Sequence, residues 1–127
     1  MYATDANTLI YFFKGMGNVA QRLLATPPRE FAIPAVVLYE LEMGTAHSTA
    51  RRAALDAIVR VCRILPFDAQ AANRAAAIRN ELAQKGLLIG PLDILIAATA
   101  SANGATLVTH NTAEFSRVPG LFIEDWF

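Results

Sequence analysis

The chain has 127 residues, 54% of them hydrophobic, and its eleven basic and eleven acidic side chains cancel. So large a hydrophobic share predicts a folded core and excludes a disordered chain. The length suits a single domain spanning residues 1–127. The zero net charge neither supports nor excludes a nucleic-acid partner.

No feature of the sequence directs the chain to a membrane or out of the cell. Asp93 interrupts the best apolar run, which stays short of the roughly 18 residues that cross a bilayer. The first residues lack the basic region of a signal peptide. Cys62 is the single cysteine, so we expect a buried thiol, no intrachain disulfide and a reducing compartment. We therefore expect a cytoplasmic protein without membrane association.

Short apolar segments alternate with helical ones along the chain. Strands are predicted at 1–4, 31–33, 64–66, 105–109 and 121–124. Helices are predicted at 6–14, 18–25, 35–46, 49–61, 69–85 and 91–103. Asn7 or Thr8 is the expected cap of the first helix, and Asp68 that of the fifth. This alternation predicts one α/β domain with a mostly parallel sheet and helices on both of its faces.

Polar residues recur near the carboxyl ends of the predicted strands. Ligands of open parallel sheets bind beyond the carboxyl ends of the strands. Asp5 ends the first strand, Thr109 and Asn111 end the fourth, Glu40 lies early in the helix after the second, and Asp93 opens a helix. Each has an ordinary structural explanation as well. Asp5 and Asp93 suit helix starts, Glu40 and Glu42 could be solvated surface, Asn111 suits a turn, and Glu114 could be a surface charge.

Four of these side chains would place negative charges in one cleft, namely Asp5, Glu40, Asp93 and Glu114. Carboxylates a few ångströms apart raise one another's pKa and cannot all stay ionised unaided. A divalent cation removes the conflict, and oxygen ligands favour Mg²⁺ or Mn²⁺. His47 and His110 stand alone, so the sequence offers no zinc site.

With these residues in place, the chain resembles the PIN-domain ribonucleases, and in particular the VapC toxins of bacterial toxin–antitoxin pairs. The resemblance runs nearly end to end and rests on an ordered set of segments. They are TDAN at 4–7, LYELEMG at 38–44, IRNEL at 78–82, IGPLDILIA at 89–97, LVTHNTAEF at 107–115, VPGL at 118–121 and EDW at 124–126.

The resemblance implies a PIN-like domain whose metal-binding acids are Asp5, Glu40 and Asp93. A fourth acidic position of many PIN domains falls at Asn111, an amide, so Glu114 is the candidate replacement. Thr109 and Asn111 would then hold a water on the metal. The implied activity is an Mg²⁺- or Mn²⁺-dependent endoribonuclease that hydrolyses phosphodiester bonds of RNA through a metal-activated water. It would leave 5′-phosphate and 3′-hydroxyl ends.

The resemblance also implies partners. The substrate class would be transfer RNA or another structured RNA, and Arg79 and Arg117 are our candidates for anchoring its phosphates. The resemblance implies a homodimer and a small VapB-like antitoxin that silences the toxin by laying a helix and an extended tail over the cleft. The apolar segment 9–13 (LIYFF) could be a docking surface for that helix or could simply pack into the core.

Two other functions are weighed against the nuclease. A phospho-accepting receiver domain also gathers acids at strand ends, but Asp5 has no acidic neighbour and both lysines lie on helices or at a helix end. A catalytically weak PIN-like module that only binds RNA or a partner is the stronger alternative. It rests on the amide at Asn111.

Overall fold

The computed structural model describes residues 1–127 and contains a five-stranded sheet, seven α-helices and one 3-10 helix. The strands are β1 (Tyr2–Thr4), β2 (Phe31–Pro34), β3 (Arg63–Leu65), β4 (Thr106–Val108) and β5 (Ile123–Glu124). The helices are α1 (Ala6–Lys14), α2 (Val19–Leu24), η1 (Pro28–Glu30), α3 (Ala35–Gly44), α4 (Thr49–Val59), α5 (Ala69–Gln84), α6 (Pro91–Ala102) and α7 (Thr112–Phe115). All five predicted strands and all six predicted helices are present, with ends that differ by a few residues. The short helices η1 and α7 were not predicted.

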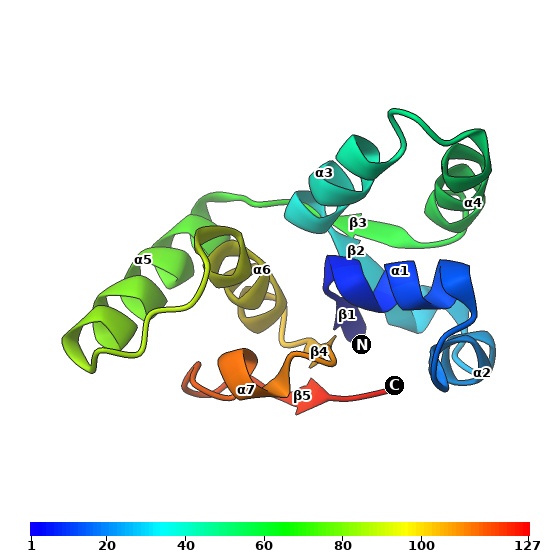
Figure 1. Ribbon diagram of the computed structural model, residues 1–127. Coiled ribbons are helices and arrows are strands. Elements are labelled where there is room, and N and C mark those ends of the chain that lie inside the picture. Colours follow the sequence, from blue (N-terminus) through cyan, green and yellow to red (C-terminus); the bar gives the residue numbers. More distant parts are fainter.

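The sheet has the order β3-β2-β1-β4-β5, and every neighbouring pair is parallel. β1 lies at the centre, so the chain moves outward to β3 and then crosses back to β4 on the other side of β1. Right-handed connections in the two directions put α1–α4 and α5–α7 on opposite faces. In Figure 1, α5 and α6 lie side by side, away from α1, α2 and α4. The predicted α/β fold is confirmed.

Single polar side chains cap the starts of three helices, α1, α4 and α5. The carboxylate of Asp5 accepts a hydrogen bond from the Thr8 backbone amide at 2.9 Å and caps α1. Asp68 does the same for α5 through the amide of Ala71 at 3.0 Å. The expectation that Asn7 or Thr8 caps α1 is therefore wrong. The helix begins directly after the strand, so the cap falls on the residue between them.

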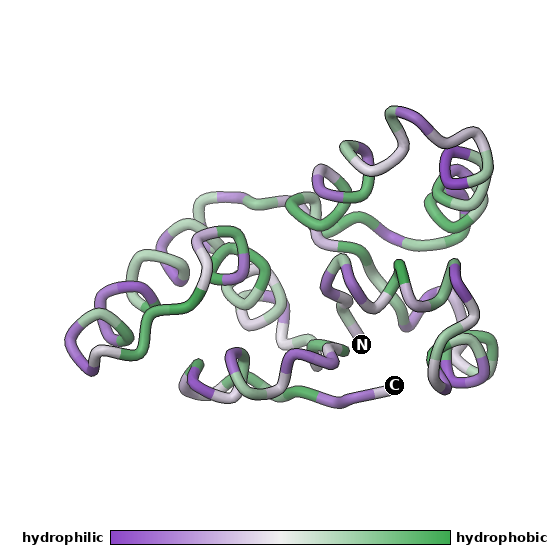
Figure 2. The backbone as a smooth tube through the Cα atoms, viewed as in Figure 1, coloured by the Kyte–Doolittle hydropathy of each residue, from purple (hydrophilic) through white to green (hydrophobic).

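A single core of 27 buried residues links the sheet to its helices. Strand β2 is buried along its whole length, and α6 buries six residues between Ile94 and Ala100. Figure 2 shows hydrophobic colour along β2 and along the segment that joins α5 to α6. No helix is both long and apolar enough to cross a membrane.

The last residues of the chain close against the turn between α1 and α2. The Phe127 carbonyl accepts hydrogen bonds from the Asn18 backbone amide at 2.7 Å and from its side-chain amide at 3.1 Å. Gly17 has a φ of +62°, and a Cβ there would lie 2.6 Å from the Phe127 carbonyl oxygen. This contact therefore requires glycine at position 17.

Replacing Gly17 with alanine tests that contact, and Gly15→Ala is the matched control. Gly15 has a similar φ of +67°, but its Cβ would meet nothing within 4 Å. We expect Gly15→Ala to cost roughly 1 kcal/mol for the left-handed backbone alone. Gly17→Ala should cost roughly 1–3 kcal/mol more because it also displaces Phe127. Equal losses of unfolding free energy in urea would show that the packing against Phe127 contributes nothing.

Candidate cation-binding crevice

A small polar crevice lies at the carboxyl end of the parallel strands. It has a volume of about 70 Å³ and is lined by eight residues: Asp5, Ala6, Asn7, Glu40, Asp93, Ile96, Asn111 and Phe115. Four of these, Asp5, Glu40, Asp93 and Asn111, are sequence-predicted site residues from four separate segments. Of the four carboxylates predicted to share one cleft, Asp5, Glu40 and Asp93 therefore line one crevice, whereas Glu114 does not line it.

Asp5 is the most firmly fixed of the acids. It is 5% exposed, and each of its carboxylate oxygens accepts a hydrogen bond. The Thr8 amide donates to Oδ1 at 2.9 Å, and the Thr109 hydroxyl donates to Oδ2 at 2.6 Å. Because a carboxylate oxygen carries two lone pairs, both oxygens can still bind a cation. Asp5 is thus a helix cap and a wall of the crevice at once.

Glu40 enters the crevice from α3 and is only partly satisfied there. Its Oε1 atom is buried and has no hydrogen-bond partner. Burial raises the pKa of this carboxyl, and the nearby charge of Asp5 raises it further. Glu42, two residues on, instead forms an ion pair with Arg52 at the surface, as expected for a solvated residue. An unpartnered, buried carboxylate oxygen facing other acids is suited to a metal ligand.

Asp93 lines the crevice from the first turn of α6. Burial, the largest cause, acts together with the nearby carboxyls of Glu114, Glu40 and Asp5 to raise its pKa to about 6. A Cβ at Gly90 would lie 3.2 Å from Asp93 Oδ2, so the glycine leaves room for the carboxylate. The repulsion predicted among the acids therefore affects the pKa of Asp93 most strongly.

Asn111 and Glu114 form a pair at the mouth of the crevice. The Asn111 side-chain amide donates to Glu114 Oε2 at 2.8 Å. The Glu114 carboxyl is also one of the neighbours that raise the pKa of Asp93. Glu114 therefore contacts Asn111, which is the arrangement expected if Glu114 replaces the acid that is missing at position 111.

Thr109 organises the base of the crevice and does not line it. The side chain is fully buried, donates to Asp5 and accepts the Asn111 backbone amide at 3.0 Å. Sequence reasoning did not select Asn7 as a site residue, although it lines the crevice from the first turn of α1. Its position two residues after Asp5 is the signal that could have identified it.

The two candidate arginines lie outside this lining. Arg79 lines a separate apolar hollow between α5 and the start of α6. The Arg117 guanidinium donates to the Leu88 carbonyl at 3.3 Å. Their role in anchoring phosphates stays a prediction.

The donor set fits a hard divalent cation. Three carboxylates supply oxygen ligands, one of them with a buried orphan oxygen, and no histidine or cysteine lines the crevice. The acids face one space but are not drawn together, since no three His, Cys, Asp or Glu side chains are close enough to hold an ion as they stand. A bound cation would offset the repulsion among these carboxylates.

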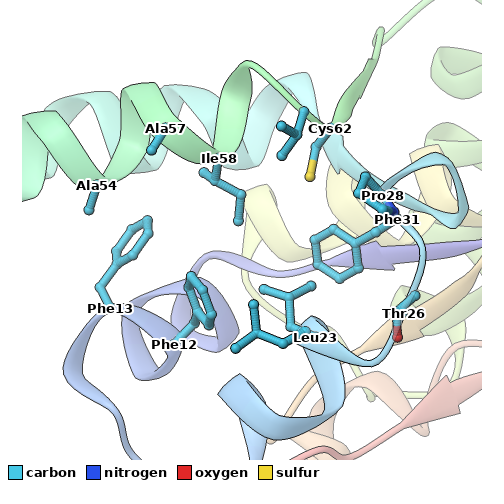
Figure 3. A pocket seen from close by; sticks show the side chains of 12 residues that line it. Phe12, Phe13, Leu23, Thr26, Pro28, Phe31, Ala54, Ala57, Ile58 and Cys62 are labelled. Carbon is cyan, nitrogen blue, oxygen red and sulfur yellow. The ribbon is translucent and has the colours of Figure 1, made fainter.

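A larger hollow lies between α1, α2 and α4. Its lining is apolar, whereas that of the crevice is mostly polar. The hollow has a volume of about 380 Å³ and ten of its twelve lining residues are hydrophobic. Phe12 and Phe13 project into it from α1, opposite Ile58 of α4 (Figure 3). Cys62 lines the same hollow and is half-buried, so the expectation of a fully buried thiol is wrong. Burial raises the pKa of that thiol.

Comparison with known proteins places the chain among characterised relatives. The model of the PIN domain matches residues 2–121. The ribonuclease VapC2 of Rickettsia felis is 37% identical over 99% of this chain and 98% of that relative. The tRNA(fMet)-specific endonuclease VapC of Salmonella typhimurium is 34% identical over 98% of this chain and 97% of that relative. The crystal structure of VapBC2 from Rickettsia felis bound to a promoter DNA fragment matches with a TM-score of 0.91 at 35% identity, covering 99% of this chain and 98% of that one.

The raised pKa of Asp93 predicts that removing the charge of this side chain stabilises the metal-free protein. A carboxyl whose pKa is raised on folding destabilises the fold as pH rises from 3.8, its ordinary value, to about 6. At pH 7.5 with EDTA, Asp93→Asn should gain about 1 kcal/mol of unfolding free energy, a figure reduced for partial solvent screening. Below pH 4 this gain should vanish.

Urea unfolding at both pH values measures the effect. Added Mg²⁺ should stabilise the parent and leave Asp93→Asn unchanged, because only the parent keeps the full acid set. A variant that is less stable than the parent in EDTA at pH 7.5 would contradict electrostatic crowding at this position.

Proposed function

The chain belongs to the PIN-domain family, and we propose that it is a VapC-type endoribonuclease that uses a divalent cation held by Asp5, Glu40 and Asp93. The observation that carries the cation is the buried, unpartnered Oε1 of Glu40 in a crevice shared with two other acids. Mg²⁺ or Mn²⁺ suits these oxygen ligands. When bound, the cation would offset charge on the scissile phosphate and make a water molecule a better nucleophile.

The chain's own residues would prepare the crevice for this reaction. Thr109 holds one carboxylate oxygen of Asp5 and leaves its other lone pairs toward the crevice. The Asn111 amide and the Glu114 carboxyl, already paired at 2.8 Å, would orient the attacking water beside Asp93. Glu114 would supply the acidic group that Asn111 lacks.

Transfer RNA is the substrate class that we propose. The Salmonella relative is named a tRNA(fMet)-specific endonuclease, and the likeness to it extends over nearly the whole chain. Hydrolysis by an in-line water would leave a 5′-phosphate and a 3′-hydroxyl. Initiator tRNA is accordingly the first substrate to assay.

An antitoxin is the protein partner that we propose, and the apolar hollow is its docking surface. The related structures from Rickettsia felis and Salmonella typhimurium are VapBC assemblies. The hollow between α1, α2 and α4 is largely apolar and open, which fits the apolar face of a helix. The segment 9–13 then combines both roles considered for it, core packing and partner docking, because Leu9 is buried while Phe12 and Phe13 line the hollow.

A homodimer stays a prediction. Its candidate surface is the second hollow, along α5 and the start of α6, which is lined by eight hydrophobic residues. Leu88, exposed at 46%, and Leu92, exposed at 36%, lie at or beside this surface.

Cleavage of RNA by the purified protein tests the nuclease directly. Initiator tRNA and total RNA are incubated with Mg²⁺ or with EDTA, and the new ends are mapped. Asp93→Asn should lose at least roughly a hundredfold in rate, because a ligand of the cation loses its charge. Glu114→Gln should also be slower, whereas Glu81→Gln on the outer face of α5 should match the parent.

Three outcomes would count against these assignments. Metal-independent cleavage would remove the cation from the proposal. A rate for Glu114→Gln equal to that of Glu81→Gln would remove Glu114 from the site. A protein that binds RNA but cuts none under either condition would favour the binding module over the nuclease.

The docking surface is tested by placing a charge in the hollow. Phe13→Asp should weaken inhibition by the cognate antitoxin at least about tenfold, because a carboxylate in an apolar interface is costly to desolvate. Phe122→Asp is the matched control, since Phe122 is 74% exposed and lies outside the hollow. Inhibition constants from the RNA cleavage assay provide the comparison. Equal inhibition of the two variants would place the antitoxin elsewhere.

A further inference from the structure

An exposed imidazole, that of His110, adjoins the crevice in the sequence. His110 follows Thr109, whose hydroxyl donates to Asp5, and precedes Asn111, which lines the crevice. On α1, Asn7 lines the crevice and Tyr11 lies one turn further along the same face. Tyr11 and His110 contact each other, with ring centroids 5.9 Å apart. Two separate segments, α1 and the loop after β4, therefore connect the crevice to an aromatic cluster.

The imidazole of His110 is held in a fixed orientation despite its exposure. One face stacks on the Phe127 ring, with centroids 4.2 Å apart and the planes at 19°. Its Nδ1 atom lies 2.9 Å from Asp125 Oδ2. Asp125 Oδ1 in turn accepts the Phe127 backbone amide at 2.9 Å, and the Phe127 carbonyl is tied to Asn18. Such restraint is uncommon for a surface side chain, because ordering it costs conformational entropy.

None of the other aromatic rings of this cluster covers the opposite face of the imidazole. Tyr11 is 5.0 Å from Phe127 and 5.9 Å from His110, with its plane nearly perpendicular to both. A ring on the outer face of His110 would lie roughly 8 Å from Phe127, twice the stacking distance. Tyr11 therefore stands beside the stack, and the His110 side chain remains 46% exposed.

We propose that the open face of His110 is a stacking platform for the nucleobase next to the scissile phosphate. This inference rests on the proposed function, because the phosphate is taken to bind at the crevice. Proteins that recognise unpaired RNA stack its bases on aromatic side chains, histidine included. Phe127, Asp125 and Tyr11 are positioning residues that keep the platform in place.

The location favours RNA as the ligand over a general apolar contact. His110 directly precedes Asn111, which lines the crevice, so a base on the platform and a phosphate in the crevice would belong to neighbouring positions of one strand. Stacking accepts any base, and it would add affinity without selecting a sequence. The platform would therefore hold the strand and leave selectivity to other contacts.

Steady-state cleavage of initiator tRNA separates the platform from a structural role. His110→Ala should raise KM about tenfold, with the effect on KM exceeding that on kcat. His110→Phe keeps a flat face and should stay within about twofold of the parent. His47→Ala, the other histidine of the chain, is the control and should match the parent.

Two results would overturn the platform in this assay. One is an unchanged KM for His110→Ala, and the other is a lower kcat with unchanged KM, which would make His110 a positioning residue only. A KM for His110→Phe as high as that of His110→Ala would also exclude stacking.

A binding measurement that needs no cleavage keeps this inference distinct from the nuclease proposal. Bulk transfer RNA is added to the Asp93→Asn variant, and the imidazole proton signals of its two histidines are followed by NMR. Stacking should move the His110 ring signals upfield through the ring current of the base and leave those of His47 in place. RNA binding without a shift at His110 would overturn the platform, whatever the cleavage assay gives.

Discussion

Mutual repulsion among buried and half-buried carboxyls is the constraint on which this structure depends. Asp5, Glu40 and Asp93 come from β1–α1, α3 and α6, and the parallel sheet brings them to one crevice. Their neighbours respond to that crowding. Thr109 donates a hydrogen bond to Asp5, while burial and the neighbouring carboxyls raise the pKa of Asp93 to about 6. The fold thus bears an electrostatic cost that a divalent cation would remove, which is the arrangement expected of a metal-dependent hydrolase.

Two surfaces of different chemical character share helix α1. The crevice is polar and small, whereas the hollow between α1, α2 and α4 is apolar and about 380 Å³ in volume. Helix α1 belongs to both, because Asn7 lines the crevice and Phe12 and Phe13 line the hollow. A partner docked in the hollow would therefore contact the same helix that Asp5 caps, close to the platform at Tyr11 and His110.

The sequence predicted the fold and the acids because both follow from local rules. Alternating strands and helices favour a parallel sheet, and Asp5, before α1, and Asp93, in the first turn of α6, lie at element boundaries that such a sheet brings to one edge. Glu40 instead lies in the middle of α3, later in the helix than the sequence suggested. Features that depend on packing could not be predicted in this way. The orphan oxygen of Glu40 depends on how α3 is seated, and the His110–Phe127 stack joins residues without any sequence pattern between them. The cap of α1 was misassigned because the strand ends only one residue before the helix.

The most direct test of the central claim is the affinity of the crevice for Mn²⁺, followed by the electron paramagnetic resonance signal of the free ion. The account predicts that the parent binds Mn²⁺, that Mg²⁺ competes for the same site, and that Glu40→Gln weakens binding at least about tenfold by removing one charged ligand. Equal affinity in the parent and in Glu40→Gln, or no Mn²⁺ binding by the parent, would contradict the claim that these acids share a cation.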